Sequence, residues 1–222
     1  MRLATIAERV AHVRQRVERA AERAGRSPAD ITIVAVSKSV SPQAIEEAVA
    51  AGIAHVGENR VQEAAAKIPG LRGLPVTWHL VGHLQTNKAK TALELFDIIH
   101  SVDSLHLAEA LSHRSQRPLP VLLEVNVAGE AAKFGFPPGE VAAAAQAVAR
   151  LPRLDLRGLM TVAPFVKDPE TVRPVFRELR CLRDALGLAE LSMGMSDDFE
   201  VAIEEGATLV RIGRAIFSER MP

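Results

Sequence analysis

The clearest candidate for covalent chemistry in this sequence is a lysine at the end of a predicted buried strand. Residues 31–40 read ITIVAVSKSV, and this apolar, β-branched run predicts a buried strand with Lys38 directly after it. Ser41 and Pro42 then begin a predicted helix. Parallel α/β folds place their chemistry at the carboxyl ends of strands, where partial burial favours the neutral amine that attacks carbonyl groups. Taken alone, the stretch still favours a lysine that only extends into solvent.

Two later segments have the composition of an anion-binding site. Ser196 follows a short predicted strand over 191–194 and lies at or next to the cap of a predicted helix over 197–205. A helix N-terminus offers unpaired N–H groups and a partial positive charge to an anion. Residues 211–214 read RIGR and predict a second strand-to-helix turn, in which Gly213 allows a close backbone approach. Phosphate sites in α/β barrels often use these two loops, although a simple cap and a simple turn would have the same sequence.

The elements that must position these residues alternate along the chain in units of about 25 residues. Strands are predicted over 31–36, 54–59, 77–82, 98–102, 119–127, 156–162, 191–194 and 209–213. The main helices between them are predicted over 42–51, 61–67, 105–114, 138–150, 169–186 and 197–205. Alternating strands and helices predict a parallel α/β fold, and eight strands are the number that closes a (β/α)8 barrel. We therefore predict a single-domain (β/α)8 TIM barrel over residues 1–222, with a doubly wound open sheet as the alternative.

An extra helix is predicted before the first strand. Its apolar stripe repeats at alternating three- and four-residue steps and consists of Leu3, Ile6, Val10, Val13, Val17 and Ala20. Gly25 ends this helix. The last strand is followed only by a short turn over 215–217, so the N-terminal helix is free to cover the gap in the outer ring.

The composition excludes several classes of protein. The 27 basic and 27 acidic residues cancel, so no global field points to nucleic acid or to a membrane surface. The single cysteine, Cys181, excludes a disulfide framework, and no histidine set has the spacing of a metal site. No apolar run could span a bilayer and no signal peptide is recognisable. A cytoplasmic location is expected, and a monomer is favoured.

In a barrel, the polar residues that follow the strands would meet at one mouth. They are Lys38, Glu58, Asn59, residues 79–87, Asn126, Ser196, Arg211 and Gly213. A lysine opposite a phosphate site suggests a phosphorylated aldehyde held as a Schiff base, which fits pyridoxal phosphate or the sugar phosphate of an aldolase. If Arg211 faced the pyridine nitrogen of pyridoxal phosphate, that nitrogen would be left unprotonated. His79 could contact a ligand, or it could be a barrel histidine satisfied by its neighbours.

At this point the sequence resembles a known family, the pyridoxal phosphate homeostasis proteins (YggS/PROSC-like), which are similar to the barrel domain of alanine racemase. The resemblance covers nearly the whole chain. It rests on VAVSKSVSPQAIEEAVAAG, HVGENRVQEAAAK, TWHLVGHLQTNK, IIHSVDS, LEVNVAGEAAKFGF, LRGLMTVAP and LSMGMSDDFEVAIEEGATLVRIGRAIF.

The resemblance implies a role for each candidate site residue. It implies that Lys38 carries pyridoxal phosphate as a Schiff base and that Arg211 faces the pyridine nitrogen. Ser196, Gly213 and the residue at Arg214 would hold the phosphate, and the residues expected to line the cofactor are Asn59, His79 and Met160. The family usually has threonine at the position of Arg214 and glycine at that of Ser218. The guanidinium of Arg214 could therefore bind phosphate or point away from it.

The expected function is to bind pyridoxal phosphate and take part in intracellular vitamin B6 homeostasis, with no catalytic residue assigned. Alanine racemase abstracts one proton with a tyrosine from its second domain, and this sequence has no tyrosine. Amino acids or pyridoxal-phosphate-dependent apoenzymes are possible partners. The alternative is a small, racemase-like enzyme on an unidentified amino acid with Lys38 as its base, and a Schiff-base aldolase is the weaker third hypothesis.

Overall fold

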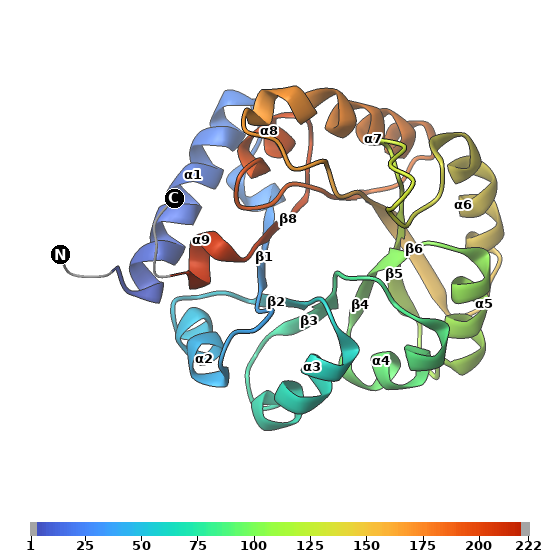
Figure 1. Ribbon diagram of the computed structural model, residues 1–222, viewed down its shortest axis with the longest axis horizontal. Coiled ribbons are helices and arrows are strands. Elements are labelled where there is room, and N and C mark those ends of the chain that lie inside the picture. Colours follow the sequence, from blue (N-terminus) through green and yellow to red (C-terminus); the bar gives the residue numbers. More distant parts are fainter. Residues whose placement is uncertain (1–3, 219–222) are drawn as a thin grey trace.

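Eight parallel strands form a closed barrel and follow one another around it in chain order (Figure 1). In the computed structural model, which describes residues 4–218, the barrel closes where β8 pairs with β1. The strands are β1 (Thr32–Val36), β2 (His55–Glu58), β3 (Thr77–Leu80), β4 (Ile98–Val102), β5 (Leu119–Glu124), β6 (Leu154–Met160), β7 (Glu190–Ser192) and β8 (Leu209–Ile212). This confirms the predicted (β/α)8 barrel and excludes the open sheet, which would leave two unpaired edges.

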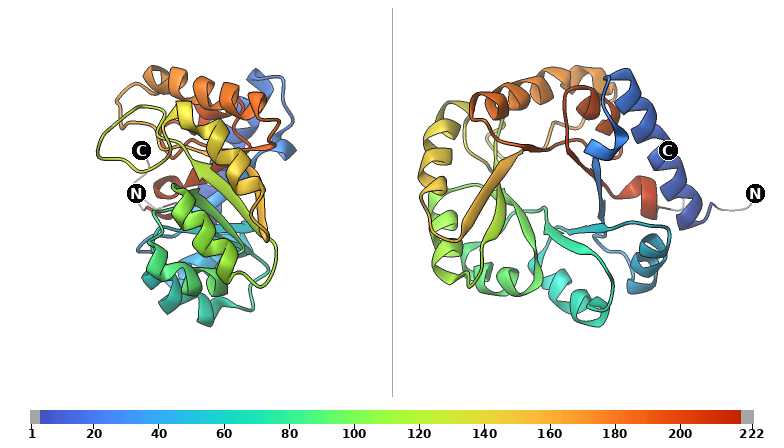
Figure 2. Two further views of the ribbon diagram at one scale, coloured as in Figure 1. Left: turned by 90° about the vertical axis from the view of Figure 1, so that its right-hand side faces the viewer. Right: turned by 180° about the vertical axis from the view of Figure 1, so that it is seen from behind.

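The helices surround the barrel on its outside, as the side and rear views show (Figure 2). Those within residues 4–218 are α1 (Ile6–Arg23), α2 (Pro42–Ala50), α3 (Val61–Lys67), α4 (Ala89–Leu95), α5 (Leu105–Arg114), α6 (Val141–Ala149), α7 (Arg173–Ala185), α8 (Phe199–Glu204) and α9 (Arg214–Phe217). Helices α6 and α7 begin later than predicted, because Pro138–Glu140 and Pro169–Val172 form 3-10 turns that a proline begins.

Helix α1 fills the gap in the outer ring that the short helix α9 leaves. Thr5 and Glu8 form a capping box at its start. Its apolar stripe is buried and consists of Ile6, Val10, Val13, Val17 and Ala20. The helix packs against α2, α8 and α9, so its predicted position is confirmed (Figure 1). Leu3, which the sequence pattern assigns to the same stripe, lies outside the described residues.

The inside of the barrel combines small apolar clusters with buried polar side chains. One cluster consists of Val34, Val81 and Leu209, and the other of Ile98, Leu122 and Met160. Buried polar side chains on the strands include His79, His100, Ser192 and Arg211. Because buried polar groups need hydrogen-bond partners, these residues must form a network across the barrel.

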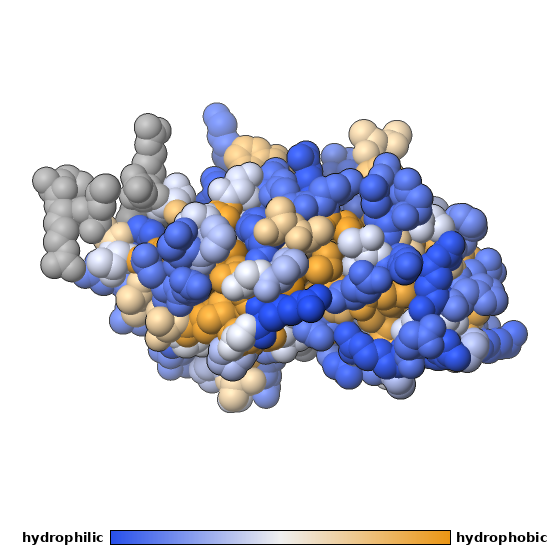
Figure 3. Space-filling view, turned by 90° about the horizontal axis from the view of Figure 1, so that it is seen from below, coloured by the Kyte–Doolittle hydropathy of each residue, from blue (hydrophilic) through white to orange (hydrophobic). Residues whose placement is uncertain are grey.

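The outer surface is mostly hydrophilic on the side that forms the lower edge of Figure 1. Figure 3 shows that face, on which hydrophobic residues appear in the gaps between hydrophilic ones. Among residues 4–218, no helix has both the length and the apolar character to cross a bilayer. The large hydrophobic side chains that are exposed include Phe165 and Met195, and both of these line the cavity described next.

Candidate functional site

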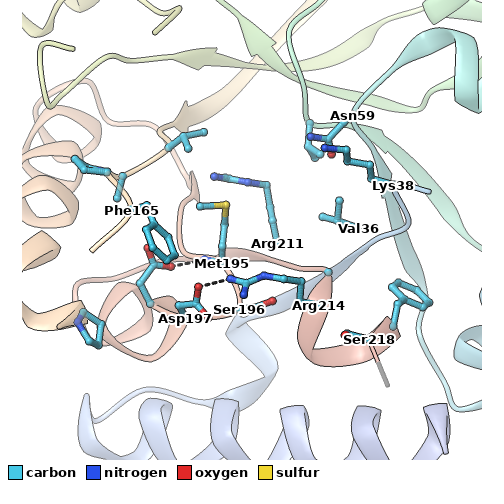
Figure 4. Close-up of a pocket in the computed structure, with 18 of the residues that line it drawn as sticks. Val36, Lys38, Asn59, Phe165, Met195, Ser196, Asp197, Arg211, Arg214 and Ser218 are labelled. Atoms are coloured by element: carbon cyan, nitrogen blue, oxygen red, sulfur yellow. Dashed lines mark hydrogen bonds and ion pairs between the residues drawn. The ribbon is translucent and has the colours of Figure 1, made fainter. Parts of the chain in front are cut away.

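A cavity of about 780 Å³ is lined by the segments at the carboxyl ends of β1, β2, β6, β7 and β8. Most of the predicted cofactor-site residues line it, namely Lys38, Asn59, Ser196, Arg211, Gly213 and Arg214. Lys38 and Asn59 lie together on one side, Ser196 and Arg214 lie on another, and Arg211 reaches between them (Figure 4). The fold therefore brings together residues from opposite ends of the sequence, such as Lys38 and Arg214.

Lys38 lies in the turn after β1, at the mouth of the cavity. It is exposed, whereas partial burial was expected, because a turn beyond the strand end holds it. The next residue, Ser39, has a φ of 57°, in the left-handed region that residues other than glycine rarely adopt. Such a conformation persists where neighbouring contacts fix it, and the Ser39 N–H donates to Glu63 Oε2 at 3.2 Å.

A buried ion pair fixes the residue directly before Lys38. Glu58 Oε1 accepts hydrogen bonds from Ser37 Oγ and Lys67 Nζ, each at 2.6 Å. Lys67 Nζ also donates to the Ser37 carbonyl oxygen at 2.8 Å. Burial raises the pKa of Glu58, and the hydrogen bonds from Lys67 and Ser37 oppose this rise. The role of Lys67 was not predicted, although a buried glutamate at a strand end is a signal that a cation must pair with it.

Asn59 follows β2 and offers an unused acceptor beside the cavity. Its Oδ1 atom is buried and has no hydrogen-bond partner among the described residues. The backbone around it is tightly packed, since a Cβ on Gly82 would lie 2.3 Å from the Asn59 carbonyl oxygen. A buried acceptor without a donor costs free energy, so a ligand that donates a hydrogen bond here would be stabilised.

Ser196 belongs to the start of α9 rather than to the cap of α8. The N-cap of α8 is Asp198, and Ser196 Oγ instead accepts a hydrogen bond from the Ala215 N–H at 3.3 Å. Gly194 has a φ of +89°, and a Cβ there would lie 2.6 Å from the Ala202 Cβ, so this turn requires glycine. The two predicted anion loops therefore meet, and the Ser196 hydroxyl contacts the Ala215 N–H directly after the second loop.

The guanidinium of Arg214 is held at the rim of the cavity. It forms an ion pair with Asp197, which lies in the first anion loop (Figure 4). Both side chains are largely exposed, so the pair contributes little stability and can open without a large cost. Gly213, directly before it, approaches β1 closely, because a Cβ there would lie 3.3 Å from the Val36 carbonyl oxygen. The chain can therefore offer an anion the backbone of this turn and, after a rearrangement, the Arg214 side chain.

Arg211 extends from β8 across the floor of the cavity. It donates to Ser192 Oγ at 2.6 Å and to the Thr161 carbonyl oxygen at 2.8 Å. Burial lowers the pKa of Arg211 to about 10, while Asp198 and Glu124 act in the opposite direction. The guanidinium therefore remains a fixed cation at neutral pH, and its position is set by two hydrogen bonds.

His79 and Met160 lie below the cavity and do not line it. His79 is fully buried on β3 and forms hydrogen bonds with the rings of His55 and His100. Met160 packs inside the barrel with Ile98 and Leu122. The geometry therefore does not support the predicted cofactor contacts of these two residues, because both side chains point into the layer beneath the cavity floor.

The segment after β6 forms a cavity wall that the sequence pattern did not predict. Its residues in the wall are Val162, Ala163, Pro164, Phe165, Val166, Lys167 and Pro169, and Lys133 joins them from the loop after β5. Lys133 Nζ donates to the Val162 carbonyl oxygen at 3.2 Å. Loop walls of this kind carry no strand or helix periodicity, so only the order of residues in a family motif could have indicated them.

Together, these residues define a (β/α)8 barrel protein whose site suits an anionic carbonyl compound. The site combines an accessible amine on Lys38, two joined turns suited to an anion, and the buried cation Arg211 between them. Among residues 4–218, no group of three histidine, cysteine, aspartate or glutamate side chains could hold a metal ion.

Comparison with known proteins agrees with this class. Residues 9–220 match the family described as alanine racemase, N-terminal domain. The pyridoxal phosphate homeostasis protein of Pseudomonas aeruginosa is 47% identical, with 98% of this chain and 97% of that protein covered. The protein of the same name from Aquifex aeolicus is 45% identical, with 96% and 97% covered. The chain therefore belongs to the family of pyridoxal phosphate homeostasis proteins.

A solved structure of a relative extends the comparison to the fold. PipY of Synechococcus elongatus, solved with pyridoxal phosphate bound, superposes with a TM-score of 0.84 at 39% sequence identity. The alignment covers 96% of this chain and 100% of PipY. PipY and this chain thus share one fold over nearly their whole lengths.

Proposed function

We propose that this protein binds pyridoxal 5'-phosphate in the cavity, with Lys38 as the point of covalent attachment, and takes part in vitamin B6 homeostasis. The observation that carries the proposal is the arrangement of an accessible amine, an anion-suited turn and a buried cation around one cavity. The relatives named above support it, because they are pyridoxal phosphate homeostasis proteins and PipY was solved with pyridoxal phosphate bound.

The residues present fit this cofactor in their chemistry. The unpartnered Oδ1 of Asn59 can accept a hydrogen bond from a ligand beside Lys38. The Ser196 hydroxyl and the backbone at Gly213 and Arg214 suit a phosphate group. Arg211 presents a fixed positive charge, which suits an unprotonated pyridine nitrogen. When bound, the cofactor supplies an aldehyde that a lysine amine holds reversibly as a Schiff base.

Each residue then has a separate task in holding the cofactor. The Glu58 and Lys67 pair fixes Ser37 and so the backbone that carries Lys38. Asn59 orients the ligand beside the amine. Ser196 and the turn at Gly213 bind the anionic group and fix its distance from Lys38.

Reversible storage and release, rather than turnover, is the role we assign to this site. Lys38 is exposed at the mouth, so an incoming amine can reach the attachment point. The sequence also contains no tyrosine to act as the second base of a racemase. Broad screening of amino acids for α-deuterium exchange tests the alternative of a small racemase-like enzyme, and exchange catalysed by the loaded protein would favour that alternative.

The proposal extends to the domain organisation, the oligomeric state, the location and the partners of the protein. We infer that residues 1–222 act as one cofactor-binding domain, that the protein is a monomer in the cytoplasm, and that amino acids or apoenzymes dependent on pyridoxal phosphate accept the cofactor. Transfer to an apoenzyme is measured as activity gained on mixing it with the loaded protein. A molar mass twice that of one chain in light scattering would contradict the monomer.

The proposal is tested by absorption spectroscopy of loaded protein. Wild-type protein mixed with pyridoxal phosphate is expected to develop a band at about 420 nm, typical of a Schiff base of this cofactor. Lys38→Ala should abolish the band. Lys167→Ala is the control, since it removes another cavity lysine to which we assign no attachment. A band that survives in Lys38→Ala would contradict attachment at Lys38.

A further inference from the structure

A chain of three histidines crosses the inside of the barrel and ends at Arg211. His55 Nδ1 lies 3.0 Å from His79 Nε2, and His79 Nδ1 lies 2.8 Å from His100 Nε2. His100 Nδ1 lies 2.8 Å from Ser192 Oγ, which in turn accepts a hydrogen bond from Arg211 at 2.6 Å. The chain links the start of β2, through β3, β4 and β7, to the floor of the cavity.

All three imidazole rings in this chain are neutral near pH 7. Burial, with a smaller contribution from His55, lowers the pKa of His79 to about 3. Burial also lowers the pKa of His100, and the neighbouring His79, Arg211 and His55 act in the same direction. The pKa of His55, at the outer end, is lowered by burial as well. A neutral imidazole carries one N–H and one acceptor nitrogen, so the whole chain can run in only one of two directions.

Ser192 decides between these two directions. Arginine can only donate, so one lone pair of Ser192 Oγ is occupied by Arg211. If His100 also donated to this oxygen, the buried Ser192 O–H would have no acceptor, because residues 4–218 place no other partner on it. An unsatisfied buried hydroxyl is costly. The satisfied arrangement has Ser192 donating to His100 Nδ1, His100 Nε2–H donating to His79 Nδ1, and His79 Nε2–H donating to His55 Nδ1.

We propose that this chain is a polarised positioning relay, which keeps a lone pair of Ser192 directed at Arg211 and thereby fixes the guanidinium at the cavity floor. Each N–H or O–H donor in the chain points away from the cavity, toward the half-buried His55. The relay adds the positioning of Arg211 to the proposed function. It rests on that function in one respect, namely that Arg211 faces the cofactor. His55, His79, His100 and Ser192 are positioning residues, since none of them lines the cavity.

The charged groups around the relay disfavour an added proton on its imidazole rings. The charged groups that influence Arg211 are Asp198 and Glu124, and the nearest influence on His100 besides the other histidines is Arg211 itself. A proton added to His100 would place a second positive charge next to Ser192 Oγ, which already contacts the positive charge of Arg211. Such a proton is therefore disfavoured, and His79 and His100 stay neutral near pH 7.

The first test uses the wild-type protein without cofactor and so does not depend on the proposed function. Nitrogen-15 NMR of the imidazole rings distinguishes the two neutral tautomers and the charged form. His79 and His100 are expected as Nε2–H tautomers that do not titrate between about pH 5 and about pH 9. Nδ1–H tautomers, or titration of either ring in this range, would overturn the relay.

The second test removes the Ser192 hydroxyl while a matched variant keeps it. Ser192→Ala leaves His100 Nδ1 without its donor, so the NMR spectrum should show a mixture of His100 tautomers. It should also weaken the binding of pyridoxal phosphate by about tenfold, the effect of losing one hydrogen bond to a charged group. Ser192→Thr retains the hydroxyl and should restore a single tautomer and an affinity within about threefold of wild type.

The outcomes separate the two proposals. If wild-type protein fails to bind pyridoxal phosphate while the tautomers are as expected, the proposed function fails and the relay stands. If Ser192→Ala binds the cofactor as wild type does and keeps a single His100 tautomer, the relay is refuted while the function stands. Should Ser192→Ala not fold, the tautomers of the wild-type protein still decide the question.

Discussion

At the scale of single residues, a glutamate at the end of β5 is protonated more readily than usual. Burial, with a smaller contribution from Asp103, raises the pKa of Glu124 from 4.5 to about 7 against the opposing effect of Arg211. Its Oε2 atom is buried and has no partner among the described residues. Between these two pH values the folded state holds a proton that the unfolded state has lost. Stability therefore falls as the pH rises from about 4.5 to about 7.

Glu124→Gln should remove this loss of stability. The free energy of unfolding of the variant, minus that of wild type, is expected to increase by roughly 1–3 kcal/mol from about pH 5 to about pH 8. Urea unfolding at both pH values measures it. Glu109→Gln, which changes an exposed carboxylate on α5, is the control and should show no such increase. A difference for Glu124→Gln that is equal at both pH values would contradict the raised pKa.

The Ser196 hydroxyl has the most direct expected effect on the phosphate. Ser196→Ala should weaken the binding of pyridoxal phosphate by about tenfold, because a hydrogen bond to a charged group is lost. Pyridoxal, which lacks the phosphate, should bind to the variant and to wild type equally. Fluorescence titration measures both affinities.

A serine at a helix cap that does not line the cavity provides the control for Ser196→Ala. Ser41 Oγ accepts a hydrogen bond from the Ala44 N–H at the start of α2. Ser41→Ala should lower the free energy of unfolding by about 1 kcal/mol and leave the affinity unchanged. An equal loss of pyridoxal affinity in Ser196→Ala would show that the hydroxyl supports the turn and does not bind phosphate.

The sequence predicted some site residues and missed their supports, for a physical reason. Lys38, Ser196 and Arg211 were predicted because each lies at or just after the end of an apolar run, which can be recognised locally. Ser192 was missed because its partner Arg211 comes from another strand, so the pairing depends on how the barrel closes. Lys67 was missed because its contact with the Ser37 carbonyl oxygen joins two successive β/α units.

At the scale of elements, helix α1 supports the turn that carries the anion site. Arg9 is a buried residue of α1, and its Nε donates to the Ile216 carbonyl oxygen of α9 at 2.6 Å. It also donates to the Ala4 carbonyl oxygen. Since α9 begins directly after Gly213, this contact connects the first helix of the chain to the second anion loop.

Arg9→Ala should therefore destabilise the protein and loosen the site together. The loss of hydrogen bonds from a buried cation is expected to lower the free energy of unfolding by about 2 kcal/mol. The affinity for pyridoxal phosphate should also fall, because α9 is less firmly held. Arg19→Ala removes an exposed arginine of the same helix and should change neither quantity. Equal effects of the two substitutions in chemical denaturation would contradict the role of Arg9.

Elements were easier to predict than their ends. All eight strands were recognised from the sequence, several as the apolar runs typical of buried parallel strands and the others from their regular alternation with helices. Strand β5 ends at Glu124 rather than at residue 127, because the chain there turns into the loop that lines the cavity. The cap of α8 is Asp198 rather than Ser196, whose hydroxyl instead accepts a hydrogen bond from a turn that is distant in sequence.

At the scale of the whole molecule, the barrel converts a linear order of strands into one site. Its closure brings the amine after β1 next to the turn after β8, since these two strands are neighbours. The polar interior beneath them carries the histidine relay to the cavity floor. The covalent attachment at Lys38, the binding of an anion at Ser196 and Gly213, and the positioning of Arg211 thus all depend on the closed barrel.

The most direct test of this account is to locate the covalent bond. Protein loaded with pyridoxal phosphate is reduced with borohydride, digested, and analysed by mass spectrometry of its peptides. We expect the reduced cofactor on Lys38, in the peptide that contains residues 36–39. A label on Lys133 or Lys167, the other lysines that line the cavity, or no label after loading, would contradict the central claim.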